Sequence, residues 1–311
     1  MEQTLIAANE GLKKNNVCAA IICYYPDQHF FNRLNLIREQ VDCIIIVDNS
    51  VNAFVKFFLQ TTSSNNKITY IFNEKNFGIG IALNQGCNYA RKLGYQWVLV
   101  LDQDTTVSRR MVETYFKIYE SLDNKETVAI ISSNFKDPYS GKVEFRQQKY
   151  RWIETEAVIS AGSLISLPAY NNIGHFKEDF FIDSVDFEYC LRARQKRYRI
   201  ILVMEPLMLQ PIGKSIIHSI FGIRWLTLIT KNHAPLRYYY MTRNNLMLSK
   251  EYMVKESKWI TIAVICLLKA LFLMLCFEKE KLLKIKYIFL GIYDAIVMDM
   301  KRKFLSAPPG T

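Results

Sequence analysis

The sequence predicts an α/β fold in which a mostly parallel central sheet is covered by helices on both faces. Three observations predict it. Short, continuous runs of β-branched and aliphatic residues alternate with amphipathic helical segments between residues 17 and 135. These runs lack the polar alternation of a half-exposed sheet, so we expect both faces to be buried. Polar side chains follow several runs directly, at the strand ends where such sheets bind ligands.

The predicted elements follow one another at the spacing of βαβ units. Strands are expected at 17–25, 43–50, 67–73, 97–104 and 128–135, and helices at 29–40, 81–94 and 109–122. After residue 140 the pattern is less regular, with strand-like runs at 157–167 and 200–210. Residues 180–200 are acidic first and basic later, which suits the macrodipole of a helix that begins near 183–186 and ends near Arg197.

Charge divides the chain into two parts. The protein has 311 residues, of which 50% are hydrophobic and 22% charged, so a disordered chain is excluded. Its net charge is +11, yet residues 214–311 hold 16 basic and 6 acidic residues and the remainder is nearly neutral. We therefore expect one domain at 1–210 and a basic, apolar, helical, membrane-associating region at 211–311. The near-neutral first part argues against a nucleic-acid-binding protein.

Cysteine usage and the N-terminus favour a cytosolic location. The seven cysteines form no CxxC pair and lie mostly in apolar runs, as reduced thiols do. The first residues lack a basic segment followed by an apolar stretch, so no secretory signal is expected.

Residues 259–277 form the most apolar segment of the chain, interrupted only by Thr261 and Lys269. Three interpretations stay open: a core helix of a helical appendage, an interfacial or re-entrant helix, and a membrane-spanning helix, for which the length is borderline. Lysines flank the segment on both sides and favour attraction to an anionic membrane surface.

Asp102 and Asp104 are the first candidate site residues. They stand one residue apart after the apolar run WVLVL, so the sheet would place both carboxylates at its ligand-binding edge. Hard oxygen ligands suit Mg²⁺ or Mn²⁺, which commonly share their coordination shell with substrate phosphates.

Two further candidates lie after the second and third strands. Asp48 could accept a hydrogen bond from a base or a ribose, or could be an ordinary turn residue in Asp-Asn-Ser. Gly78 and Gly80 open a predicted helix, where free N–H groups favour phosphate. A third glycine is missing and the motif follows the third strand, so a dinucleotide site of the Rossmann type is not expected.

Asp183, Asp186 and Glu188 place three carboxylates within six residues. Their repulsion would raise at least one pKa, which is the environment of a general base. The alternative is a set of helix N-terminal acids stabilised by the helix dipole. The four histidines are too scattered for a zinc site of the usual spacing.

Taken in order, seven motifs resemble the family 2 nucleotide-sugar glycosyltransferases of the GT-A fold. Within this family the chain is most similar to the bacterial rhamnosyltransferases of O-antigen and polysaccharide assembly, which use dTDP-rhamnose. The resemblance runs from Val17 to Asn245. The motifs that carry it are AIICYYPD, IVDNS, NFGIGIALNQG, LDQDT, SAGSLIS, FFIDSVDFEYCLR and PLRYYYMTRN.

The resemblance implies a role for each matching residue. Asp186 would be the catalytic base, with Asp183 the next candidate. Asp104, helped by Asp102, would bind the Mg²⁺ or Mn²⁺ that bridges the diphosphate. Asp48 would contact the nucleotide base, and Asp102 would contact the ribose. Asn76, Gly78 and Asn84 would shape the donor pocket. In the motif FFIDSVDFEYCLR, Glu188 would be the second acid and Arg192 would be the closing residue.

Two positions depart from the family pattern. Val185 stands where relatives have an acid directly before the base, and Gln210 stands where many relatives have a metal-binding His. Gln210 therefore places strict metal dependence in question.

The function that the resemblance implies is inverting transfer of a sugar, L-rhamnose, from a nucleotide-sugar donor to a hydroxyl group. The acceptor would be a lipid-linked glycan at the cytoplasmic face of the inner membrane, with the protein held there peripherally or interfacially. Alternatives are another donor, such as a UDP-hexose or UDP-galactofuranose, and a catalytically silent nucleotide-sugar-binding module.

Overall fold

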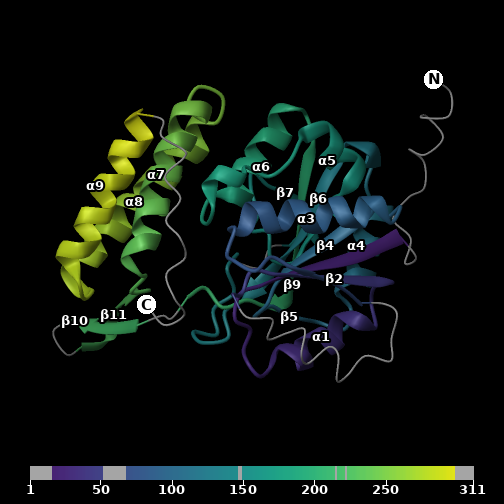
Figure 1. Ribbon diagram of the computed structural model, residues 1–311, viewed down its shortest axis with the longest axis horizontal. Coiled ribbons are helices and arrows are strands. Elements are labelled where there is room, and N and C mark those ends of the chain that lie inside the picture. The colour runs from purple at the N-terminus through teal and green to yellow at the C-terminus, as the bar shows by residue number, and fades with distance from the viewer. Residues whose placement is uncertain (1–15, 52–67, 146–148, 214–215, 221–222, 298–311) are drawn as a thin grey trace.

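The computed structural model describes residues 16–51, 68–145, 149–213, 216–220 and 223–297. Its α/β part contains a central sheet with helices on both sides, and its C-terminal part contains a group of three helices and a small hairpin (Figure 1). The predicted α/β class is confirmed.

The central sheet is mixed, which corrects the expectation of a mostly parallel sheet, because four of its eight strand pairs in the described residues are antiparallel. Its strand order is β3-β2-β1-β4-β8-β6-β9-β5, with β7 paired to β9. Strands β3, β2, β1 and β4 are parallel, whereas β8 runs antiparallel between β4 and β6. The strands are β1 (Val17–Cys23), β2 (Cys43–Asp48), β3 (Ile68–Phe72), β4 (Trp97–Asp102), β5 (Thr106–Val107), β6 (Val128–Lys136), β7 (Trp152–Glu154), β8 (Ser163–Ser166) and β9 (Arg199–Leu209).

Alternate residues of each strand face opposite helical layers. Cys18 and Ala20 of β1 face the cluster that includes α3, α5 and α6, whereas Val17 and Ala19 face the cluster formed with α1 and α4. The uninterrupted burial of β1 follows from this double cover. The helices are α1 (Phe30–Arg38), α3 (Ile79–Lys92), α4 (Met111–Glu120), α5 (Leu167–Ile173) and α6 (Val185–Gln195), with short 3₁₀ turns at Lys125–Thr127 and Glu178–Phe180.

The region after residue 210 corrects one prediction, because it is not helical throughout. It begins with an antiparallel hairpin of β10 (Ile216–Ile220) and β11 (Ile223–Thr230), and helices follow from Pro235. The β-branched residues of 223–230 favour a strand over a helix. The helices are α7 (Pro235–Tyr252), α8 (Ser257–Phe277) and α9 (Lys281–Val297). The domain boundary at residue 210 stays a prediction.

Helices α7 and α9 pack closely, whereas α8 buries only a few of its residues against the rest of the protein. A Cβ atom on Gly291 of α9 would lie 2.7 Å from the carbonyl oxygen of Tyr239 in α7, so only glycine permits this approach. Helix α8 fully buries only Ile260, Leu267 and Met274. Within the described residues it is the one helix whose length and composition would allow it to cross a membrane, and 11% of its most apolar window is buried.

A buried ion pair connects the end of α8 to α9. The Lys284 ammonium donates to Glu278 Oε2 at 2.8 Å, and both side chains are almost fully buried. Glu278 also accepts from the Tyr238 hydroxyl at 2.9 Å and from the Asn232 backbone N–H at 3.0 Å. This network joins α7, α9 and the α8–α9 turn.

We expect Lys284→Met to lower the free energy of unfolding by about 3–5 kcal/mol, because it leaves the Glu278 carboxylate buried without its cation. Denaturant titration measures the loss. The control is Lys279→Met at an exposed neighbouring position, which should change stability by less than about 0.5 kcal/mol. Equal stability of the two variants would contradict the assigned role of the pair.

Candidate functional site

Strand register brings two of the predicted acids to one edge of the sheet. Cys23 of β1 pairs with Asp48 of β2, and Ile22 of β1 pairs with Asp102 of β4. Because these strands are parallel, both carboxylates lie at the carboxyl edge, separated by the width of β1. Asp48 is fully buried and accepts hydrogen bonds from the Ser50 backbone N–H and the Tyr70 hydroxyl.

Asp102 is the electrostatic centre of this edge. Burial, together with the neighbouring carboxylates Asp104 and Asp186, raises its pKa to about 7, while Arg237 opposes them. Burial also raises the pKa of Asp104. Burial and mutual repulsion therefore disfavour ionisation of these carboxyl groups, and a bound cation would relieve both effects.

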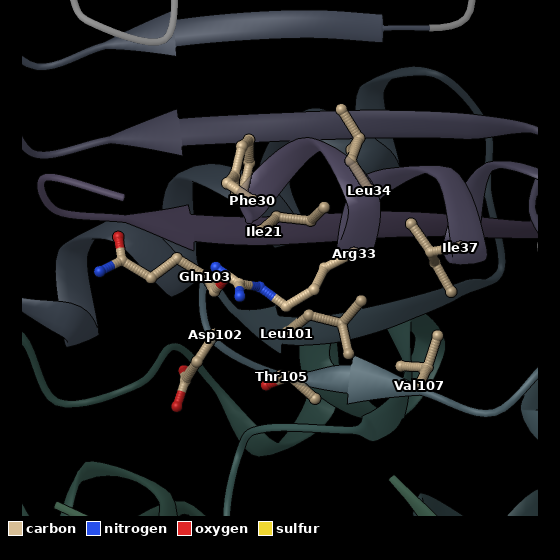
Figure 2. A pocket seen from close by; sticks show the side chains of 10 residues that line it. All are labelled: Ile21, Phe30, Arg33, Leu34, Ile37, Leu101, Asp102, Gln103, Thr105 and Val107. Carbon is tan, nitrogen blue, oxygen red and sulfur yellow. The ribbon is translucent and has the colours of Figure 1, made fainter. Parts of the chain in front are cut away.

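Gln103 fixes the backbone between these two acids. Its side chain accepts from the Tyr24 N–H at 2.6 Å and donates to the Tyr24 carbonyl at 3.0 Å. Arg33 of α1 donates through Nε to the Gln103 carbonyl at 2.8 Å. Figure 2 shows the Arg33 side chain extending toward Gln103, whereas the Asp102 carboxylate points away from the apolar residues of α1. Asp104 lines a neighbouring cavity of about 420 Å³ together with Gln103, Arg33 and Tyr25.

Gln210 joins the same group from the end of β9. Its Oε1 accepts from the Thr105 hydroxyl at 2.6 Å, and its Nε2 donates to Asp102 Oδ2 at 3.3 Å. The residue that departs from the family pattern therefore lies beside the acid pair.

The site fits a divalent cation bound with substrate. Asp102 and Asp104 offer hard oxygen ligands, and the charge of Asp104 raises the pKa of Asp102, which a cation would reverse. No cluster of three or more His, Cys, Asp or Glu side chains that could hold a metal ion occurs among the described residues. Mg²⁺ commonly binds through one or two carboxylates plus substrate phosphates, so this pair would need the phosphates to complete the shell.

Asp186 lies at the start of α6. Its carboxylate accepts from the backbone N–H groups of Ser160 at 3.2 Å and Phe187 at 2.9 Å. Burial nevertheless raises its pKa to about 6, a value suited to a base near neutral pH. Asp186 borders a small cavity with Ser160, separate from the cavity of Asp104, and Asp102 is coupled electrostatically to both acids.

The loop before α6 has a strained backbone. Phe181, Asp183 and Ser184 adopt positive φ values of 57°, 64° and 63°. Such conformations cost about 1–3 kcal/mol each in non-glycine residues and persist only where surrounding contacts impose them. The loop can approach the start of α3 only because residue 78 is glycine. A Cβ atom at Gly78 would lie 2.7 Å from the Phe181 carbonyl oxygen.

Helix α7 supplies the contacts that hold the loop. Asn244 Nδ2 donates to the carbonyls of Phe180, Ile182 and Asp183 at 2.8–2.9 Å. Arg237 forms a bidentate ion pair with Asp183, with distances of 2.9 and 3.1 Å.

Arg243, the residue before Asn244 in α7, is fully buried against the rings of Tyr239 and Tyr240 and donates to the Asp179 carbonyl. The resemblance covers this stretch but assigns its residues no role. The available signal was the pair Arg237 and Asn244, which lie two turns apart and so share one face of the helix.

Two other predicted site residues, Glu188 and Arg192, form hydrogen bonds to other residues of the protein. Both oxygens of Glu188 accept from Arg192 at 2.9 Å, and one accepts from the Tyr252 hydroxyl at 2.8 Å. Glu188 is 0% exposed, so its carboxylate presents no surface to a substrate. Arg192 also donates to the carbonyls of Ile173 and His175, and it thereby ties α6 to the end of α5.

Asn84 and Asn76 shape the backbone near the site. Asn84 of α3 is buried and binds the Tyr170 hydroxyl and the backbone of Phe176, which connects α3 to the loop after α5. Asn76 Oδ1 accepts from the Gly78 N–H at 2.9 Å and closes the turn before α3.

Comparison with known proteins identifies similar sequences and folds. The model of the family described as "Glycosyl transferase family 2" matches residues 21–185. A dTDP-rhamnosyl transferase, RfbF of Shigella flexneri, is 25% identical over 248 residues, covering 76% of this chain and 81% of RfbF. A low-salt glycan biosynthesis hexosyltransferase, Agl10 of Haloferax volcanii, is 22% identical over 63% of this chain and 67% of its own length.

Among solved structures, residues 1–349 of S. aureus TarS in complex with UDP-GlcNAc superpose with a TM-score of 0.58. The two chains are 14% identical, with 90% of this chain and 80% of that one covered. This likeness confirms the predicted GT-A fold. The chain spans half the length of the longer TarS structure.

We expect Asn244→Ala to lower the free energy of unfolding by about 1–3 kcal/mol, because three carbonyls of the strained loop lose their donor. Hydrogen exchange should accelerate at the amides of residues 180–184. Asn245→Ala is the matched control, since Asn245 donates only within α7, to the Met241 carbonyl. Unchanged exchange in the Asn244 variant would show that other contacts impose the loop conformation.

Proposed function

Because the chain belongs to glycosyl transferase family 2 and is therefore a glycosyltransferase, we propose that it transfers a sugar with inversion from a nucleotide-sugar donor to an acceptor hydroxyl. The observation that carries this proposal is that the carboxylates of Asp104 and Asp186 both lie near enough to Asp102 to raise its pKa. Their proximity supports a donor diphosphate bound at Asp102 and Asp104, with its sugar directed toward Asp186.

Asp186 is the proposed catalytic base. Its raised pKa leaves it ionised at neutral pH and basic enough to remove a proton from an attacking hydroxyl. The two backbone N–H groups fix its direction without neutralising it. Asp183 is less suited to this role because Arg237 already binds both of its oxygens.

Asp104 and Asp102 are the proposed ligands of Mg²⁺ or Mn²⁺. The cation would neutralise charge on the departing nucleoside diphosphate. Gln210 would remain hydrogen-bonded beside the pair and offers a weaker ligand than the His of many relatives. Asp48, Asn76, Gly78 and Asn84 would shape the donor pocket, and Glu188 and Arg192 would position α6.

For the donor we propose dTDP-rhamnose. Support comes from the similarity to RfbF, which covers most of both chains. The alternatives are a UDP-hexose or UDP-galactofuranose.

For the acceptor we propose a hydroxyl of a lipid-linked glycan at the cytoplasmic face of the inner membrane. Support comes from the exposed apolar surface of α8 and the lysines at both of its ends, which suit an anionic membrane surface.

We expect Asp186→Asn to lower kcat by roughly 10²–10⁴-fold and to leave donor affinity unchanged, because the amide cannot accept the proton. In the unmodified protein, kcat should fall about tenfold per pH unit below the Asp186 pKa of about 6, where the carboxylate becomes protonated. Initial-rate kinetics and donor titration separate the two effects. Asp179→Asn, at an exposed acid of the preceding turn, is the control and should retain activity. Full activity of the Asp186 variant would move the base to Asp183.

A panel of nucleotide sugars tests the donor and the cation together. With Mn²⁺ present, dTDP-rhamnose should give the largest thermal stabilisation and the fastest donor hydrolysis, and EDTA should abolish both. Preference for a UDP-sugar would overturn the rhamnose assignment alone. Binding without turnover of any donor would favour the catalytically silent module.

A further inference from the structure

A groove between α6, α7 and α8 lies outside the residues assigned above to the donor. It has a volume of about 370 Å³, within the usual range of ligand pockets. Asp183 and Ser184 of the strained loop line it together with Trp259, Ala263 and Cys266 of α8. Phe187, the residue after the proposed base, contacts Trp259 edge to face at a centroid distance of 5.4 Å.

The polar and apolar lining residues of the groove come from different elements. The polar residues come from the loop before α6 and from α7, whereas every lining residue of α8 is apolar or a thiol. The Asp183 carboxylate is already paired with Arg237, so the loop does not present an uncompensated charge to the groove. The lining residues of the loop therefore suit hydroxyl groups, and those of α8 suit a hydrocarbon chain.

The groove is continuous with the exposed apolar face of α8. Ile262 lines the groove and is 51% exposed, and the exposed face continues through Ile265, Leu268 and Phe272. Exposed lysines stand at both ends of this helix, at 255, 258, 279 and 281. An amphiphile with an anionic head group and a hydrocarbon tail matches this arrangement of charge and apolar surface.

Resting on the proposed transferase function, we propose that this groove binds the lipid chain of the acceptor and directs its sugar hydroxyl past Asp183 and Ser184 toward Asp186. The groove thus selects a lipid-linked acceptor over a free sugar. The exposed face of α8 lets the remaining chain stay in the membrane.

Two native cysteines report on this proposal. Cys266 lines the groove, and Cys276 lies two to three turns further along α8; both are exposed, and the five other cysteines are buried. The experiment follows N-ethylmaleimide labelling of each thiol in the full chain by mass spectrometry, in one fixed detergent buffer. Farnesyl diphosphate is the probe, and inorganic diphosphate is its counterpart without a hydrocarbon chain.

We expect farnesyl diphosphate to slow labelling of Cys266 about tenfold at a concentration of about ten times Kd, because labelling requires the empty groove. Labelling of Cys276 should not change, and inorganic diphosphate should protect neither thiol. Ala263→Trp, which fills the groove, should abolish the protection by the probe. Leu268→Trp, on the exposed face, should retain it.

The proposal would be overturned if farnesyl diphosphate slowed labelling of Cys266 and Cys276 equally, or slowed neither. Protection by inorganic diphosphate alone would instead indicate an anion site, and protection that rises with protein concentration in the absence of probe would indicate a second copy of the chain. The readout does not need turnover. If the protein transfers sugar but farnesyl diphosphate does not protect Cys266, only the assignment of the groove is rejected. If the probe protects Cys266 but the protein transfers no sugar, only the proposed transferase function is rejected.

Discussion

The contact between α7 and the loop before α6 is the constraint on which the candidate site depends. Three residues of this loop have left-handed backbone conformations that an isolated chain would avoid. Asn244 satisfies three of its carbonyls, and Arg237 pairs with Asp183 at its tip. The loop in turn sets where α6 begins, and therefore where Asp186 lies. A helix distant in sequence from the proposed base thus decides the base's position.

Negative charge at the sheet edge connects the structure to its chemistry. Burial, followed by the neighbouring acids Asp104 and Asp186, raises the pKa of Asp102 to about 7. A protein that only had to be stable would not gain from such repulsion, because burying uncompensated carboxylates destabilises the folded state. A cation bound with a diphosphate would remove the repulsion, so this part of the molecule is prepared for a ligand that the chain itself does not contain.

The C-terminal helices contribute to the candidate site through α7 and to the exposed apolar surface through α8. One face of α7 holds the loop before α6, and another packs closely on α9 at Gly291. Helix α8 buries only Ile260, Leu267 and Met274 and leaves most of its apolar surface exposed. The basic, apolar tail that composition separates from the rest is therefore joined to the catalytic part through side-chain contacts.

The sequence by itself determined the α/β class, the longer strands and helices from β1 to β6, the strand-like runs that contain β8 and β9, and the placement of Asp48 and Asp102 at strand ends, because local periodicity and strand termini are encoded by neighbouring residues. It did not reveal the short strands β5 and β7 or helix α5. It did not reveal the antiparallel β8 or the β10–β11 hairpin, since strand direction depends on pairing between distant segments. Only the tertiary structure decided that Glu188 is enclosed by Arg192 and Tyr252, and that α7 holds the loop before α6. Burial and long-range hydrogen bonding create these distinctions, and neither is a property of a short stretch of chain.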